Sequence, residues 1–266
     1  MKLPPPEALI DADQRFLYDH DRRELHNDSP NDFSRQTYLN RYNVVLDAVS
    51  AFAVGRRTLD IGCAQGNFSL GLGERGYEVV ALDLRLSFLR YVKLKYEKGE
   101  VSCVKGSLEA LPFRHGAFDV VLLGEVIEHV AYPSKLLDNI NEVMRPGGLL
   151  VLTTPNGGRI HTGLPTLGDV HPEELVARQF KPDADGHLFL LTQDELVGIV
   201  EGAGMQVVSH AFFGSPWITG RLMARYIDRF LPLKVRVWFD RMTVKSPVVA
   251  RMVSDGQVVL ARKPEL

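Results

Sequence analysis

Between residues 57 and 153 the sequence alternates short apolar runs with stretches of helical periodicity, and this alternation constrains the fold more than any other feature. Short apolar runs of this kind are typical of buried strands. Strands that alternate with helices at this spacing predict a parallel sheet covered by helices on both faces. The expected strands are 57–61, 78–82, 101–105, 118–123 and 148–153, and the expected helices are 68–75, 87–96, 126–130 and 133–144.

The segments around this region predict how the chain is organised. Residues 1–43 are expected to form an N-terminal arm, irregular over 1–30 apart from one short helix, with a longer helix starting at Asp32. The core spans 44–214, and its segment 157–186 is rich in glycine and proline, as either an active-site lid or a solvated insertion would be. A helix at 193–203 and strands at 205–212 and 257–261 complete the core, so that a helical cap at 215–254 precedes the last strand within 255–266.

The composition excludes several classes of protein. The 31 Lys and Arg against 33 Asp and Glu give no basic excess, which argues against a general nucleic-acid-binding protein. Two cysteines form no disulfide framework and suit a reducing compartment. The first residues lack the apolar region of a secretory signal, and no apolar run approaches the roughly 18 residues of a membrane span. The sequence therefore predicts a cytoplasmic protein.

A glycine-containing turn and an acid on the next strand indicate a nucleoside site. The run from Thr58 to Ser69 reads as a strand ending in Asp60, a turn with Gly62 and Gly66, and a helix. Glycine lets the backbone turn sharply or approach a ligand, and the following helix start offers free N–H groups. Asp83 ends the next apolar run, 83 − 62 = 21 residues after Gly62. An acid at this position either binds both ribose hydroxyls of a nucleoside or caps the next helix.

The charge beside the turn distinguishes between nucleoside cofactors. A dinucleotide site has the pattern Gly-x-Gly-x-x-Gly, with the pyrophosphate at the helix start. Here three residues separate Gly62 from Gly66, and the Asp60 carboxylate precedes them. A carboxylate repels a pyrophosphate and suits a cation. S-adenosylmethionine carries a sulfonium and an ammonium and no phosphate, so the pattern favours a methyltransferase over a nicotinamide-dependent oxidoreductase.

The sequence resembles the class I S-adenosylmethionine-dependent methyltransferases over residues 44–212. Residues 59–66 are similar to the first motif of that family, and Asp83, 106–113, 118–130 and 144–156 are similar to later motifs in the same order. The resemblance implies an α/β fold with a doubly wound, seven-stranded, mainly parallel sheet, the Rossmann-like methyltransferase fold, with a helical cap. It also implies an antiparallel last strand and a cofactor above the carboxyl ends of the first and fourth strands.

The resemblance also implies a set of residues that bind the cofactor. Ser107 replaces the Asp with which many members bind the adenine amine, so this contact is expected to depend on the backbone near Leu108. The expected contacts are Asp60, Gly62 and Gly66 to the methionine part, Asp83 and Leu84 to the ribose, Ser107 and Leu108 to the adenine, and Glu125 near the amino group. Cys63, a small residue of the same loop, completes the expected cofactor-binding set.

Glu125, Glu128 and His129 form an acidic cluster with a histidine at the start of an expected helix, where they would share one face. Three interpretations remain open: an acidic first turn with a structural histidine, a general base at His129, or a divalent metal site. Quinone-biosynthesis O-methyltransferases and small-RNA 2′-O-methyltransferases share a similar Glu-x-x-Glu-His motif. In the RNA enzymes a downstream histidine completes a metal site, and residues 185–192 resemble that segment. The expected catalytic residues are His129, Glu128 and His187, and the sequence does not fix the metal ligands.

The segment 214–251 is basic. It has eight Lys and Arg against two acids, Asp228 and Asp240, and Arg221, Arg225 and Arg229 recur every four positions. A cap over the substrate pocket, an amphipathic helix that contacts anionic lipid, and an RNA-binding surface all fit this pattern.

Taken together, the sequence predicts a methyltransferase that acts on a small or lipid-like acceptor, and the histidines favour oxygen as the acceptor atom. S-adenosylmethionine is the expected cofactor, a divalent metal is an additional option, and residues 215–251 are the expected site of any peripheral membrane contact. A metal-assisted RNA 2′-O-methyltransferase, a nicotinamide oxidoreductase and a non-catalytic S-adenosylmethionine-binding protein remain as alternatives. The oligomeric state is not indicated.

Overall fold

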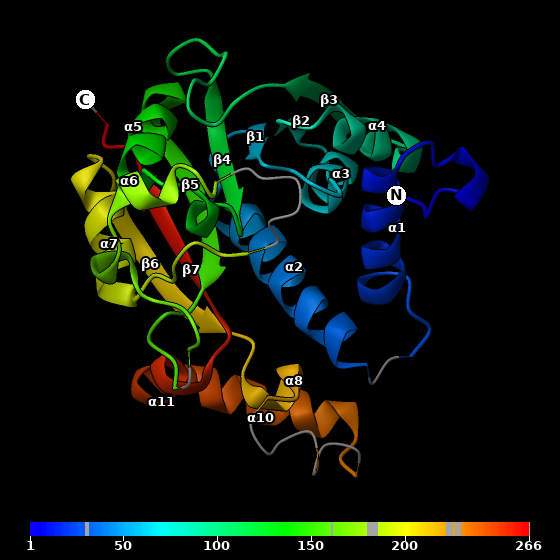
Figure 1. Cartoon of the computed structure of the whole chain (residues 1–266), viewed down its shortest axis with the longest axis vertical. Coiled ribbons are helices and arrows are strands. Elements are labelled where there is room, and N and C mark those ends of the chain that lie inside the picture. Colours follow the sequence, from blue (N-terminus) through cyan, green and yellow to red (C-terminus); the bar gives the residue numbers. More distant parts are fainter. Residues whose placement is uncertain (30–31, 161, 180–185, 222–225, 227–229, 266) are drawn as a thin grey trace.

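The structure is a computed structural model of the chain, and it describes residues 1–29, 32–160, 162–179, 186–221, 226 and 230–265. Its centre is a seven-stranded sheet with the order β3-β2-β1-β4-β5-β7-β6 (Figure 1). The order from β3 to β5 is parallel, and β7 is antiparallel to both of its neighbours. The strands are β1 Arg57–Ile61, β2 Glu78–Asp83, β3 Glu100–Lys105, β4 Phe118–Gly124, β5 Met144–Pro155, β6 Gln206–Phe213 and β7 Gly256–Arg262. The predicted doubly wound sheet with an antiparallel last strand is confirmed.

The order of the strands creates a crevice at the carboxyl ends of the central strands. β1 lies between β2 and β4, so the chain builds one half of the sheet outward from β1 and then returns to build the other half from β4. Connections that leave β1 and β4 in opposite directions open a crevice at the carboxyl ends of these strands, where ligands bind in sheets of this type. The turn after β1 and the turn after β4 therefore lie beside each other.

Helices cover both faces of the sheet, as the alternation predicts. One face packs against α5 (Pro133–Val143) and α7 (Gln193–Gly202), and the other packs against α2 (Phe33–Phe52). The buried side of α2 consists of Tyr38, Val45, Leu46 and Val49, which recur at helical spacing and leave the polar positions outside. α3 (Asn67–Glu74) and α4 (Leu86–Lys95) share a third cluster with β2.

The N-terminal segment is more regular than the sequence predicts. Instead of an irregular arm with one short helix, residues 1–29 contain η1 (Pro6–Ala8) and the 13-residue helix α1 (Ala12–Glu24). The Asp11 side chain caps α1 by accepting a hydrogen bond from the Gln14 N–H. Leu17 of α1 is buried against Phe88 and Tyr91 of α4, so α1 is packed against the core. The expectation failed because these partners lie about 70 residues away along the chain.

The expected lid and cap are only partly described. The 157–186 segment contains η3 (Leu167–Asp169) and α6 (Pro172–Leu175), while His161 and 180–185 lie outside the described residues. The cap contains α8 (Pro216–Thr219), α10 (Leu233–Lys245) and α11 (Pro247–Val253). Arg225 and Arg229, two of the three arginines that recur every four positions, and the acid Asp228 also lie outside the described residues. Over the described residues, no helix combines the length and the hydropathy that a membrane span requires.

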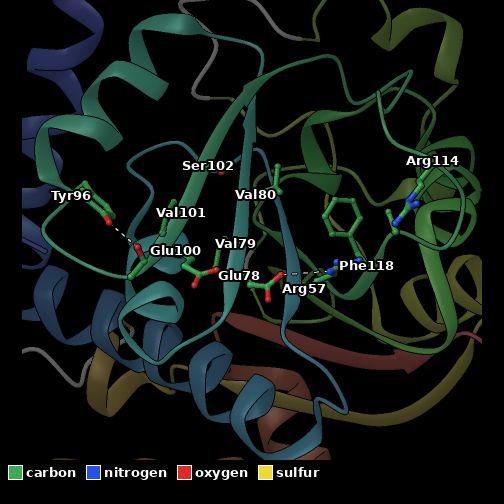
Figure 2. Close-up of a pocket in the computed structure, with 12 residues that line it drawn as sticks. Arg57, Glu78, Val79, Val80, Tyr96, Glu100, Val101, Ser102, Arg114 and Phe118 are labelled. Carbon is green, nitrogen blue, oxygen red and sulfur yellow. Dashed lines mark hydrogen bonds and ion pairs between the residues drawn. The ribbon is translucent and has the colours of Figure 1, made fainter.

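A hollow of about 670 Å³ lies at the amino ends of the strands (Figure 2). The connection 106–117 between β3 and β4, which contains no helix, contributes Arg114 and Ala117 to its lining. Charged side chains surround it, including Arg57 and Glu78, whose Nε and Oε2 atoms are 3.5 Å apart. The hollow lies at the amino ends of the strands and the crevice at their carboxyl ends. None of the predicted site residues lines the hollow.

Candidate cofactor and catalytic site

The turn after β1 is a tight loop that is hydrogen-bonded to the neighbouring strand, β2. The backbone N–H groups of Gly62 and Cys63 both donate to the Leu82 carbonyl, at 2.9 and 3.0 Å. Gly66 caps α3 with φ +70°, and a Cβ there would lie 2.5 Å from a methyl carbon of Val92. Both the conformation and the close packing therefore require glycine at this position.

Asp83, at the end of β2, joins this loop to the next one. Its Oδ2 atom accepts a hydrogen bond from the Ala64 N–H at 3.1 Å, and its Oδ1 atom accepts one from the Arg85 N–H at 2.9 Å. The side chain is largely buried, and burial raises the pKa of its carboxyl group. The carboxylate is thus held in one orientation at the edge of the crevice.

A cavity of about 150 Å³ occupies the crevice between these turns. Six of the nine predicted cofactor residues line it together with His129, which comes from the turn after β4. Because about 300–1,000 Å³ is typical of a ligand pocket, a nucleoside bound here would extend into the open mouth or displace side chains. The sequence did not point to Arg85 and Val126, which directly follow predicted residues, or to Phe88, four residues after Leu84. The complete lining is Gly62, Asp83, Leu84, Arg85, Phe88, Ser107, Leu108, Glu125, Val126 and His129.

The other three predicted cofactor residues, Asp60, Cys63 and Gly66, do not line this cavity. Asp60 is 2% exposed and accepts a hydrogen bond from the Ser69 hydroxyl at 2.5 Å, and burial raises its pKa to about 6. Burial also raises the pKa of the Cys63 thiol, which keeps it protonated and unreactive. Asp60 lies in β1, and Cys63 and Gly66 lie in the loop that follows it. A direct contact between these residues and the cofactor remains a prediction.

The turn after β4 differs from the helix expected at 126–130. It is a single 3₁₀ turn, η2 (Ile127–His129), and Glu125 before it has φ +54°. This left-handed conformation is uncommon for a residue with a side chain and costs on the order of 1–3 kcal/mol. It turns the chain abruptly at the end of the strand. Glu125 forms an ion pair with Arg41 of α2, with 3.1 Å between Nη1 and Oε2.

Glu128, His129 and His187 come together as the sequence predicted for its catalytic residues. The Glu128 Oε1 atom lies 3.9 Å from Nε2 of His187, and the two histidine rings are 5.0 Å apart at 67°. Their candidate ligand atoms all lie within 4.8 Å of one another. The resemblance to the downstream segment thus named a histidine that the fold places beside the motif. In contrast, His171 is exposed, and His161 lies outside the described residues.

The electrostatics of this cluster suit proton transfer or metal binding. Glu128 is completely buried, and burial together with the nearby Glu125 charge raises the pKa of its carboxyl group. Its Oε2 atom accepts a hydrogen bond from the Thr154 hydroxyl at 3.0 Å, whereas Oε1 has no hydrogen-bond partner among the described residues. Burial lowers the pKa of His187, so its imidazole is neutral at neutral pH.

Sequence reasoning missed a buried polar network beneath the loop after β1, called the glycine loop because it contains Gly62 and Gly66. Lys95 of α4 is completely buried and donates to the Asp21 carboxylate of α1, to the Asn67 side chain and, at 3.1 Å, to the Gln65 carbonyl of the loop. Asn67 in turn donates to Asp21 at 2.9 Å. The network ties α1 and α4 to the loop. A lysine in an amphipathic helix is typical of a solvated position, so the sequence alone gave no indication of it.

Comparisons with known proteins agree with this geometry. Residues 59–152 match the family model described as a methyltransferase domain. The chain is 32% identical over 161 residues to a ubiquinone biosynthesis O-methyltransferase of Ruegeria pomeroyi, and this alignment covers 60% of this chain and 63% of that protein. It is 35% identical over 109 residues to a demethylmenaquinone methyltransferase of Renibacterium salmoninarum, covering 41% and 45%. The alignments thus span less than two thirds of these curated relatives.

A solved structure shares the fold. The crystal structure of a S-adenosylmethionine-dependent methyltransferase from Archaeoglobus fulgidus aligns with a TM-score of 0.53 and 20% identity, and the alignment covers 84% of this chain and 92% of that chain. Identity at this level establishes the architecture alone.

Proposed function

We propose that this chain, whose residues 59–152 belong to a class I S-adenosylmethionine-dependent methyltransferase domain, transfers a methyl group to an oxygen of a small or lipid-like acceptor. One observation carries the proposal: His129 lines the same cavity as Asp83, Leu84 and Ser107. The predicted nucleoside contacts and an imidazole thus face one space. The methyltransferase matches favour this function over a nicotinamide oxidoreductase.

The reaction is an in-line displacement. The acceptor oxygen forms a bond to the methyl carbon while the bond from this carbon to sulfur breaks, and the electron pair of that bond leaves with S-adenosylhomocysteine. The hydroxyl proton passes to the imidazole of His129. Positioning the two reactants contributes on the order of 7–11 kcal/mol in such reactions, and a positioned base contributes a further 10²- to 10⁴-fold. The positive charge stays on the His129 imidazolium until the proton passes to water, and Glu128 and His187, whose candidate ligand atoms lie within 4.8 Å of that of His129, position the ring.

The lipid-like acceptor is supported by the relatives named for ubiquinone and demethylmenaquinone. Since such an acceptor resides in a membrane, the proposal includes peripheral contact with a lipid surface through residues 215–251. A hydroxyl acceptor gives a role to the histidine pair, whereas an unprotonated amine needs no base to attack the methyl group.

A divalent cation bound by Glu128, His129 and His187 is the second candidate arrangement. The donor set of one carboxylate and two imidazoles suits a transition metal, and the Glu128 Oε1 atom, without a partner among the described residues, is where a ligand atom is needed. When bound, the metal would supply Lewis acidity that lowers the pKa of the acceptor hydroxyl. We expect chelation to lower turnover at least tenfold if the metal participates, with recovery on adding back the ion. Unchanged turnover after chelation and dialysis would exclude this arrangement.

The proposed function is tested with methyl-labelled S-adenosylmethionine and matched acceptors. A phenol and an aniline with the same alkyl chain differ only in the acceptor atom. We expect label on the phenol oxygen, stoichiometric S-adenosylhomocysteine, and little label on the aniline. A preference for the aniline would contradict oxygen transfer. Cofactor binding without any S-adenosylhomocysteine formation from these acceptors or a cell extract would favour a non-catalytic binding protein.

Asp83→Ala is expected to weaken S-adenosylmethionine binding at least about tenfold, because it removes the predicted ribose acceptor and releases the Ala64 N–H. Titration calorimetry measures the effect, and thermal unfolding checks that the fold is retained. Glu78→Ala, at the amino end of the same strand, is the matched control and should leave the affinity unchanged. An unaltered dissociation constant in Asp83→Ala would remove the ribose role.

A further inference from the structure

One face of α10 carries aromatic, apolar and basic side chains that the site does not use. Lys234, Trp238, Arg241 and Lys245 recur at helical spacing and are all exposed, and Met242 lies one turn after Trp238. Trp238 is 57% exposed and Met242 50%. The opposite face holds the buried Arg236 and Asp240. α10 is thus packed on one side and offers bases and large apolar groups on the other.

α11, which begins two residues after α10 ends, also exposes apolar side chains. Val248 is 72% exposed, and Val249 and Met252 are each 45% exposed, while Ala250 points into the protein. Ile160, also exposed, donates its N–H to the Met252 carbonyl at 2.9 Å and so lies beside it. Figure 1 places α10 and α11 at the lower end of the molecule, beyond β6 and β7. We define the α10–α11 surface as Lys234, Trp238, Arg241, Met242, Lys245, Val248, Val249 and Met252.

The charge of this surface has one sign. Other arginines of the cap are already paired, Arg221 with Asp255 at 2.7 Å and Arg251 with Asp194 at 2.9 Å. Asp240, the acid among the described residues of 215–254, is buried and accepts the Ser215 N–H at 2.9 Å. Within the described part of the cap, α10 therefore presents no exposed acid beside its exposed bases, because Asp240, which precedes Arg241, is buried.

We propose that the α10–α11 surface docks on a membrane that contains anionic phospholipid. A tryptophan and aliphatic side chains surrounded by lysine and arginine suit the interface, where the apolar groups enter the acyl boundary and the bases meet phosphate. The inference rests on the proposed function, since a lipid-like acceptor has to be taken from a membrane. It identifies which face of the cap makes the contact and which lipids attract it.

The end of α11 is linked through β5 to the cluster of Glu128, His129 and His187. The Asn156 side chain donates to the carbonyls of Arg251 and Ser254, at 2.8 and 3.0 Å, and thereby fixes the end of α11 to the residues after β5. Two residues earlier, the Thr154 hydroxyl binds Glu128. Docking through α11 would therefore hold the carboxyl end of β5, and the acceptor side of the site, at the membrane.

Vesicle flotation of the full chain tests the proposal without cofactor or acceptor. We expect the protein to partition onto vesicles of phosphatidylcholine with phosphatidylglycerol at least about tenfold more than onto phosphatidylcholine alone, with the preference weakened by salt. The triple variant K234E, R241E and K245E should lose at least about tenfold of this partition. Its turnover with a short-chain, water-soluble acceptor should remain that of the wild type, which also shows that the variant folds.

A matched control reverses three exposed lysines elsewhere, Lys93, Lys98 and Lys135, and should keep vesicle binding. Equal partition of the α10 variant and this control would overturn the proposal, as would wild-type protein that ignores anionic vesicles. A wild-type dimer that the triple variant abolishes, or RNA binding lost in it, would assign the surface to another occupant. Because vesicle binding is measured without methyl transfer, its failure is distinguishable from failure of the proposed function.

Discussion

His129→Ala is expected to lower kcat by about 10²- to 10⁴-fold with a hydroxyl acceptor, the range typical of a lost general base. The dissociation constant of S-adenosylmethionine should change much less, because His129 is only one of the ten residues that line the cavity. Single-turnover kinetics and calorimetry on the same preparation separate the two effects. The loss should be largest with acceptors of high hydroxyl pKa, since these depend most on a base.

His171→Ala is the matched control for this experiment, since His171 is exposed at the start of α6 and is expected to have no effect. His187→Ala should lower kcat less than His129→Ala, because His187 acts through its contact with His129 and Glu128. Turnover equal to the wild type in His129→Ala would return this histidine to a structural role in the turn.

Lys95→Met is expected to destabilise the protein by about 3–5 kcal/mol, the usual cost of removing one partner of a buried ion pair. The substitution leaves the Asp21 carboxylate buried without its positive partner, and the Gln65 carbonyl and Asn67 lose a donor. Denaturant unfolding at neutral pH measures the change in the free energy of unfolding. Because Gln65 is in the glycine loop, the affinity for S-adenosylmethionine should also fall.

The double variant Asp21→Asn with Lys95→Met provides the control for this pair. Removing both charges should recover part of the stability that Lys95→Met loses, since no isolated charge then remains buried. Lys93→Met, two residues earlier and exposed, should change the stability by less than about 0.5 kcal/mol. A Lys95→Met variant as stable as Lys93→Met would show that the buried network does not stabilise the fold.

The features that the sequence predicted well are those set by local pattern. The strands that the sequence predicted lie within about one residue of those observed, except for β5, which spans Met144–Pro155 rather than 148–153. Asp83 and the glycine turn were found because strand, turn and helix each have a composition of their own. The prediction that His187 lies near His129 came from the family resemblance. The separation of 187 − 129 = 58 residues along the chain does not by itself imply that the two histidines meet.

The features that the sequence missed depend on contacts between distant segments. Residues 125–130 have helical spacing, yet Glu125 adopts a left-handed conformation at the end of β4. Its carboxylate pairs with Arg41, which lies 125 − 41 = 84 residues earlier. The burial of Lys95 depends in the same way on Asp21 of α1. The polar composition of α1 gave no sign in the sequence that this helix packs against the core. In both cases tertiary packing overrides local preference.

The most direct test of the account is to identify the bond that holds the transferred methyl group. The protein is incubated with methyl-labelled S-adenosylmethionine and a membrane lipid extract, and the organic phase is treated with hydriodic acid, which releases methyl groups from ethers as methyl iodide. The account predicts labelled methyl iodide from a lipid-soluble product. An organic phase without label, or label that stays bound to nitrogen or carbon after this treatment, would contradict it.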